Sequence, residues 1–205
     1  MKTTTYLDMV HEFRKEFNQF IPANYLEVRA ADLKLAASLI LEEASEYQQA
    51  KDRINIIDGL TDTAYVTFQA CAAAHITPGD YSDMTRFPVK NLQTKPNILP
   101  EVTLAYQELT KPRLCYNGLY NSLTVLYWKL EQTSQILGFH LPTTFTLVHR
   151  SNLTKLWKAN EVTEGKFPDD LIATPTHDGN HFVVTNKMGK VIKSPSYTPV
   201  DLSNF

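Results

Sequence analysis

The 205-residue chain has little glycine, little cysteine and no long apolar run. It holds seven glycines and no P-loop or GxGxxG pattern, so a glycine-rich phosphate-binding loop is not expected. Its two cysteines, Cys71 and Cys115, have neither metal-site spacing nor the density of a disulfide framework, which fits a reducing cytoplasm. No stretch approaches the roughly 18 apolar residues of a membrane span. We therefore expect a cytoplasmic protein with no membrane partner.

An excess of positive charge is also missing. Lys and Arg number 20 against 22 Asp and Glu, which gives a formal net charge of −2. Binding to a nucleic acid polymer depends on a basic surface, so no such partner is expected. The six histidines show no HExxH or comparable spacing, and we expect them in surface, capping or loop positions.

What the chain does have is helical periodicity. Apolar residues recur at spacings of three and four in long stretches, and Asp32 is the expected N-cap of the second of these. The pattern predicts helices over residues 6–20, 33–51, 56–76, 122–140 and 143–160, with a short candidate at 101–109. The predicted fold is an all-α bundle of four to five helices.

Two regions depart from this pattern. Residues 81–118 contain several prolines and are expected to run over the surface. In the tail, glycines and prolines separate short apolar runs, and residues 181–194 predict a small β-hairpin that turns at 186–189. We expect one domain over residues 1–205, with a helical core at about 5–77 and 119–160, an insertion at about 81–118 and an irregular tail at about 161–205.

Five acidic residues stand out on the second and third predicted helices: Glu42, Glu43, Glu46, Asp58 and Asp62. Spacings of three and four residues place Glu43 with Glu46, and Asp58 with Asp62, on one helix face. The short link predicts an antiparallel hairpin that brings both acidic faces together. Crowded carboxylates need a cation, and an all-oxygen ligand set suits Mg²⁺ or Mn²⁺ better than zinc. The cluster therefore predicts metal-assisted hydrolysis of a phosphoanhydride.

The alternative is a solvated helix face whose acids pair with Lys51 and Arg53. The aspartates argue against it, because Asp58 and Asp62 lie in an apolar segment where weak helix formers need a partner. Asp58 has a second interpretation as a helix N-cap. Asp62, one turn later, does not.

The segments EExxE (42–46) and DGLTDTAYV (58–66) resemble the signature of the all-α nucleoside triphosphate pyrophosphatases, which include MazG, the dimeric dUTPases and the phosphoribosyl-ATP pyrophosphohydrolases. MVHEFRKEFNQF, VHRSNLTKL and GKVIKSPSYTPVDL resemble, in order, the first helix, a later segment and the C-terminal ending of the phosphoribosyl-ATP branch. The enlarged chain also resembles phage MazG-like enzymes.

This resemblance implies a Mg²⁺-dependent enzyme that cleaves a nucleotide between its α and β phosphates, releasing a monophosphate and pyrophosphate. It implies that all five acids are catalytic, that one of them is the general base, and that the metal ligands are Glu43, Glu46, Asp58 and Asp62. Many relatives have Glu-x-x-Asp where this chain has residues 59–62, so Asp58 would supply its ligand from one position earlier.

The substrate contacts expected by resemblance and charge are Arg150, Asn152, Lys155 and Lys193. The basic ones have an alternative role as helix caps. Relatives assemble as dimers or tetramers, and the same is expected here. Two other functions stay open: cleavage of phosphoribosyl-ATP in histidine synthesis, and a non-catalytic nucleotide-binding or helical interaction module. The full set of five acids favours an enzyme.

Overall fold

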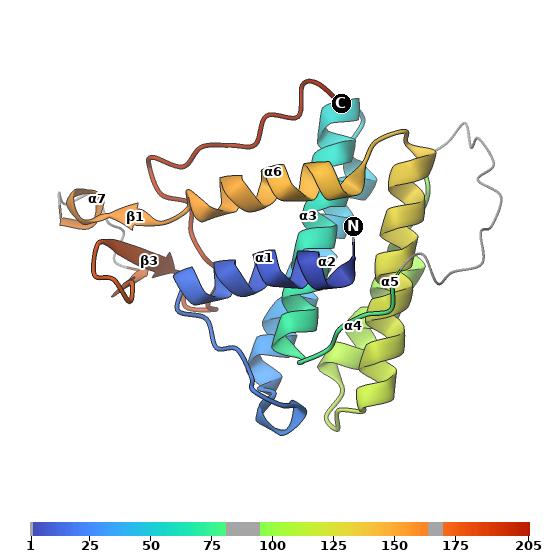
Figure 1. Cartoon of the computed structure of the whole chain (residues 1–205), viewed down its shortest axis with the longest axis horizontal. Coiled ribbons are helices and arrows are strands. Elements are labelled where there is room, and N and C mark those ends of the chain that lie inside the picture. The colour runs from blue at the N-terminus through green and yellow to red at the C-terminus, as the bar shows by residue number, and fades with distance from the viewer. Residues whose placement is uncertain (1, 81–94, 164–169) are drawn as a thin grey trace.

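The computed structural model describes residues 2–80, 95–163 and 170–205, which form seven α-helices and a three-stranded sheet (Figure 1). The helices are α1 (Thr3–Glu16), α2 (Ala30–Gln49), α3 (Arg53–Ala73), α4 (Leu99–Thr110), α5 (Tyr116–Ile136), α6 (Leu141–Leu153) and α7 (Ala159–Thr163), with a 3-10 turn at Tyr25–Glu27. The predicted helical class is confirmed, but four to five helices were too few. Within the described ranges, every helix is too short or too polar to span a bilayer.

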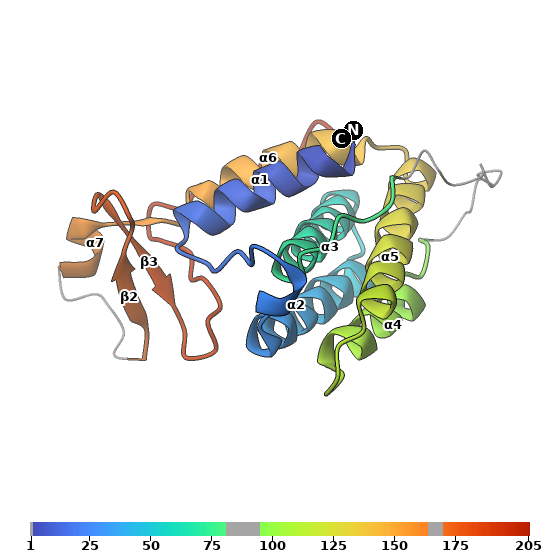
Figure 2. The same cartoon turned by 60° about the horizontal axis from the view of Figure 1, so that its bottom comes forward.

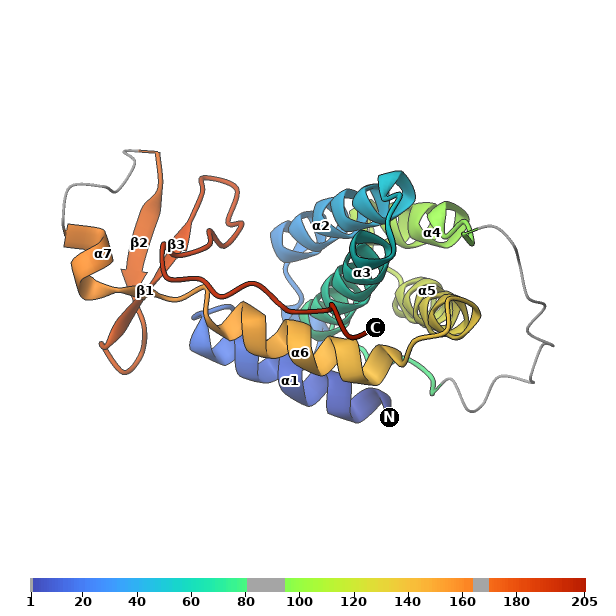
Figure 3. The same cartoon turned by 90° about the horizontal axis from the view of Figure 1, so that it is seen from above.

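The third helix lies at the centre of the bundle. It packs against α1, α2, α5 and α6, and α1 and α6 lie side by side across it (Figures 1 and 2). Small and apolar side chains on most of its surface, such as Ala64, Phe68 and Cys71, are buried. A helix that is apolar nearly all round is buried on all sides. The α4–α5 pair completes the bundle beside α2 and α3 (Figure 3).

Two expected helix caps are wrong. Arg29 precedes the first residue of α2, and Asp32 lies inside its first turn, where a carboxylate favours the helix dipole. The side chain of Asp52 caps α3 by accepting the N–H of Asn55 at 2.9 Å. Asp58 is therefore in the second turn of α3, which removes its alternative role as an N-cap.

The second half of the predicted insertion belongs to the helical core. Helix α4 buries Val102, Ala105 and Leu109 against α2 and α5 rather than running over the surface. Just before it, the Lys95 ammonium donates to three backbone carbonyls at the C-terminal end of α2. Residues 81–94 of the predicted insertion lie outside the described residues.

The sheet differs from the predicted hairpin. Strand β3 (His181–Thr185) pairs antiparallel with β1 (Trp157–Lys158) on one side and β2 (Ile172–Pro175) on the other. The predicted turn after β3 forms, but its second arm contributes a single bridge, Thr185 to Val191.

The last long predicted helix was also wrong in length, because α6 ends at Leu153 and the chain continues into β1. Beyond that end, the Thr154 hydroxyl donates to the Ser151 carbonyl and accepts the N–H of Thr198. These bonds tie the end of α6 to the C-terminal segment, and the sheet stands beyond this end of the helix (Figure 1).

Candidate active site

The acidic residues come from two helices whose backbones touch. Helices α2 and α3 form an antiparallel hairpin, and a Cβ atom at Gly59 would lie 2.9 Å from both Cα and N of Tyr47. Glycine is the residue that permits such a close approach. Asp58 adjoins Gly59, and Glu46 adjoins Tyr47, so this contact sets the separation of the two acidic faces. Sequence reasoning missed this role for Gly59.

The carboxylates of the cluster influence one another. Burial raises the pKa of Glu43 to about 7, with Glu46 and Glu42 adding to the effect. Burial also raises the pKa of Asp62 well above its usual range, with Glu43 and Asp58 contributing. The pKa of Asp58 rises mainly through burial as well, and Glu46 adds to it. The structure thus brings four acids close enough for their charges to interact.

The fifth predicted acid is exposed, as Glu46 is, and has a basic partner. Glu42 is exposed and forms an ion pair with Lys190, whose Nζ lies 2.5 Å from Oε1. Lys190 belongs to the turn after β3. The alternative partner Arg53 is engaged elsewhere, since its guanidinium donates to the backbone carbonyls of Leu137 and Phe205. The acids of α2 therefore do not use Arg53 as their ion-pair partner.

Two lysines lie beside the acids. Burial lowers the pKa of Lys155, while Asp62 and Glu43 act to raise it. Lys193 is exposed, and its charge lowers the pKa of Asp58. Both lysines were predicted substrate contacts. The site therefore combines crowded carboxylates with nearby cations.

A hydrogen-bond network joins the two segments that carry the lysines. The Ser151 hydroxyl donates to the Thr198 carbonyl at 2.8 Å and lies 3.0 Å from the Tyr197 hydroxyl. The ammonium group of Lys193 lies 4.9 Å from the centre of the Tyr197 ring. The SNLTK turn at 151–155 and the C-terminal segment therefore lie together, although they are about 40 residues apart in the chain.

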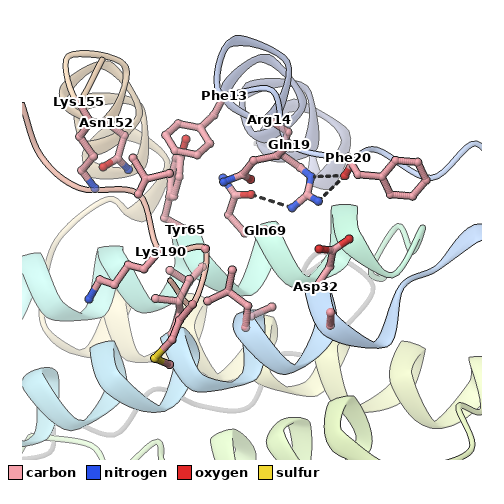
Figure 4. Close-up of a pocket in the computed structure, with 18 of the residues that line it drawn as sticks. Phe13, Arg14, Gln19, Phe20, Asp32, Tyr65, Gln69, Asn152, Lys155 and Lys190 are labelled. Atoms are coloured by element: carbon pink, nitrogen blue, oxygen red, sulfur yellow. Dashed lines mark hydrogen bonds between the residues drawn. The ribbon is translucent and has the colours of Figure 1, made fainter. Parts of the chain in front are cut away.

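A cavity of about 430 Å³ extends from the acids between α2, α3 and the C-terminal end of α1 (Figure 4). At one end it is lined by Glu43, Asp62, Lys155 and Asn152, whose side chain is buried. Arg150 is exposed on α6 and does not line the cavity. The structure therefore brings Asn152 and Lys155, but not Arg150, to the cavity.

The other end of the cavity was not anticipated from the sequence. It contains Arg14 and Gln69, which are 6% and 8% exposed, together with Phe20, Arg29 and Asp32 (Figure 4). Arginine side chains are mostly exposed in proteins, yet that of Arg14 is buried. Its burial depends on Gln69, which lies 55 positions away in the sequence, so no local pattern reveals it.

One histidine also departs from expectation. His149 is buried, and its ring nitrogens lie 3.1 Å from the Tyr65 hydroxyl and 3.1 Å from a Glu12 carboxylate oxygen. Burial raises the pKa of Tyr65, and the amides of Asn152 and Gln69 act in the opposite direction. His149 thus supports a tyrosine that lines the cavity.

In the described part of the chain, no group of three or more His, Cys, Asp or Glu side chains is arranged to hold a metal ion. The donor chemistry still fits a hard cation, because the cluster offers only oxygen ligands. Burial disfavours the ionised forms of Glu43 and Asp62, and a bound cation would offset that effect. Coordination by several of these carboxylates requires their side chains to move closer together.

Residues 10–84 match the family model of phosphoribosyl-ATP pyrophosphohydrolase, which belongs to the MazG-like all-α pyrophosphatase superfamily. This segment of the chain is similar to that family. No curated protein and no solved structure matches the chain. The matched segment holds all five acids and ends before the SNLTK turn and the C-terminal segment. The structure places those two later segments beside the acids.

Proposed function

We propose that this protein is a Mg²⁺-dependent pyrophosphohydrolase that converts a ribo- or deoxynucleoside triphosphate to its monophosphate and pyrophosphate. The main support is the acidic cluster on α2 and α3, which lies within the family match. Two of its half-buried members, Glu43 and Asp62, line a cavity of about 430 Å³. Cavities that bind small molecules have volumes of this order.

The acidic residues of the site would bind the metal ion. Glu43, Glu46, Asp58 and Asp62 would hold the metal, for which Mn²⁺ may substitute for Mg²⁺. When bound, the cation would neutralise phosphate charge and activate a water molecule.

The remaining groups act directly on the substrate. Lys155 and Lys193 would offset the negative charge of the phosphates, and the Asn152 amide would donate a hydrogen bond to them. A carboxylate of the cluster would accept a proton from the attacking water. Glu42 would act indirectly, because its ion pair with Lys190 holds the turn after β3 against α2.

A second substrate has its own support. The family model that matches residues 10–84 describes an enzyme for phosphoribosyl-ATP, and that compound carries the same triphosphate. Hydrolysis of phosphoribosyl-ATP is therefore the alternative within the same chemistry.

The test is a pyrophosphate-release assay with the full chain and Mg²⁺ against the eight common ribo- and deoxynucleoside triphosphates and phosphoribosyl-ATP. We expect release from at least one of them and a loss of at least about 100-fold in Glu46→Gln, since a missing charged group at a catalytic site commonly costs several kcal/mol. Glu16→Gln, an exposed position on α1, is the matched control and should keep full activity. Full activity in Glu46→Gln, or binding without turnover in the unaltered protein, would contradict the proposal.

A further inference from the structure

The turn after β3, residues 186–190, forms part of the cavity wall. Residues 188–191 line the cavity together with several residues of α2. A Cβ atom at Gly189 would lie 3.5 Å from Cδ2 of Leu35, so the backbone of the turn rests on α2. The turn therefore belongs to the site, although the family match ends at residue 84.

This turn has a fixed shape. Oδ1 of Asn186 accepts the N–H groups of Met188 and Lys190, both at 3.0 Å. The N–H of Gly189 donates to the Asn186 carbonyl at 2.9 Å, and Gly189 has a φ of 83°, a conformation that favours glycine. An asparagine side chain that binds the backbone of its own turn stabilises the turn. A change of partner by Lys190 therefore requires only a rotation of its side chain.

Lys190 lies at the acidic end of the cavity. Lys155 and Lys190 both line the cavity, and their ammonium groups extend toward the same end of it (Figure 4). Burial raises the pKa of Glu43, and the charge of Lys190 acts against that rise. Lys193, which the sequence favoured as a substrate contact, does not line the cavity. Lys190 is therefore better placed than Lys193 to meet a ligand inside it.

The partner of Lys190 in this structure is an exposed carboxylate. Nζ of Lys190 lies 2.5 Å from Oε1 of Glu42, and the two side chains are 40% and 42% exposed. Exposed ion pairs contribute little to stability, because water and salt screen them. A phosphate group in the cavity would be screened less, so it would compete effectively with Glu42 for the ammonium group.

We propose that Lys190 is a substrate-binding residue that leaves Glu42 and binds the outer phosphates of the triphosphate when the site is filled. This inference rests on the proposed pyrophosphohydrolase function. Glu42 holds the ammonium group at the empty site, and the substrate takes its place. Lys155 interacts with Asp62, whereas Lys190 lies beside the exposed Glu42. Lys190 therefore meets the phosphates nearer to solvent, which leave as pyrophosphate.

The other explanation is that the ion pair only holds the turn against α2. Removal of either partner would then loosen the turn and weaken ligand binding to a similar extent. If Lys190 binds phosphate, the two partners act in opposite directions, because Glu42 competes with the ligand for the ammonium group. The sign of the effect of Glu42 therefore separates the two explanations.

The experiment measures binding of inorganic pyrophosphate to the full chain by calorimetry in the presence of Mg²⁺. Lys190→Gln should weaken binding about tenfold, or about 1.4 kcal/mol, which is close to the strength of a hydrogen bond to a charged group. Glu42→Gln should strengthen binding about two- to fivefold, since an exposed ion pair no longer competes. Equal weakening by the two variants, or no binding of pyrophosphate to the unaltered protein, would overturn the proposal.

A double variant separates competition from a general effect of charge. Glu42→Gln removes a negative charge near the site, which could favour an anion without the help of Lys190. If the gain acts through Lys190, it should disappear when Glu42→Gln is combined with Lys190→Gln. A gain that persists in the double variant would refute the exchange of partners.

Two single variants serve as controls. Lys187→Gln, an exposed position on the same turn with the same change in charge, should leave pyrophosphate binding unchanged. Lys190→Arg keeps the positive charge and should keep most of the affinity. A loss in Lys187→Gln as large as that in Lys190→Gln would count against a specific role for Lys190.

The outcomes also separate this inference from the proposed function. Binding of pyrophosphate that depends on Lys190, in a protein that hydrolyses none of the nucleotides, would support the inference and contradict the reaction. Pyrophosphate release by the unaltered protein, with unchanged KM and unchanged pyrophosphate affinity in Lys190→Gln, would refute the inference and leave the reaction in place.

Discussion

Replacement of Gly59 by alanine tests whether the contact between α2 and α3 holds the acidic cluster together. The added Cβ would lie 2.9 Å from two backbone atoms of Tyr47, which no side-chain rotation can relieve. Alanine in a helix interior gains about 1 kcal/mol over glycine, whereas overpacking a close contact costs about 1–3 kcal/mol. We expect a net loss of stability of about 1 kcal/mol.

Activity should respond more strongly than stability. A loss of about 1 kcal/mol lowers the melting temperature of a protein of this size by about 2–4 °C. Displacing catalytic groups by about 1 Å can cost about 100-fold in rate, so kcat/KM for pyrophosphate release should fall at least about tenfold in Gly59→Ala. Thermal melting and steady-state kinetics on the same preparation would separate the two effects.

Gly118→Ala in α5 is the matched control. There the added Cβ meets only the end of the Glu108 side chain, which can rotate away. This variant should be as stable as the unaltered protein or slightly more stable, with full activity. If Gly59→Ala behaves in the same way, the close helix contact does not set the geometry of the acids.

Three further predictions concern charge and burial. In metal-free buffer the raised pKa of Glu43, about 7, favours the folded state below the ordinary carboxyl pKa. The melting temperature should therefore fall as pH rises through 7, and Mg²⁺ should reverse the fall. An unaltered protein without this pH dependence, or a Glu43→Gln variant that keeps it, would contradict the prediction. Lys155→Gln should raise KM about tenfold while Arg150→Gln leaves it unchanged, because only Lys155 lines the cavity; equal effects in kinetics would refute that distinction. Tyr6→Phe removes the 2.7 Å hydrogen bond to buried Glu131 and should cost about 1–3 kcal/mol in denaturant unfolding without changing kcat/KM.

The sequence was sufficient for features that depend on local pattern. Helical periodicity located the long helices, and the spacing of Glu43, Glu46, Asp58 and Asp62 placed these acids on facing surfaces of a helix hairpin. Helix ends were less predictable: the start of α2 at Ala30 has no side-chain cap, and Asp32 suggested a later start. The Asp52 cap was missed, because the predicted helix began at residue 56 whereas α3 begins at Arg53, directly after the aspartate.

Features that depend on distant residues could not be predicted. Arg14 is buried by partners that include Gln69, and β1 exists because Trp157 and Lys158 pair with Phe182 and His181. In isolation the segment before β1 continues a helical pattern. Tertiary hydrogen bonds decide such cases over local propensity.

The most direct test of the central claim is to identify the products after the protein is incubated with GTP and Mg²⁺. Separation by anion-exchange chromatography distinguishes the two cleavage positions. The account predicts GMP and pyrophosphate in equal amounts, with no GDP. The assignment of the α2–α3 acidic cluster as a pyrophosphohydrolase centre would be contradicted by the formation of GDP and orthophosphate. It would also be contradicted if Asp62→Asn formed GMP as fast as the unaltered protein.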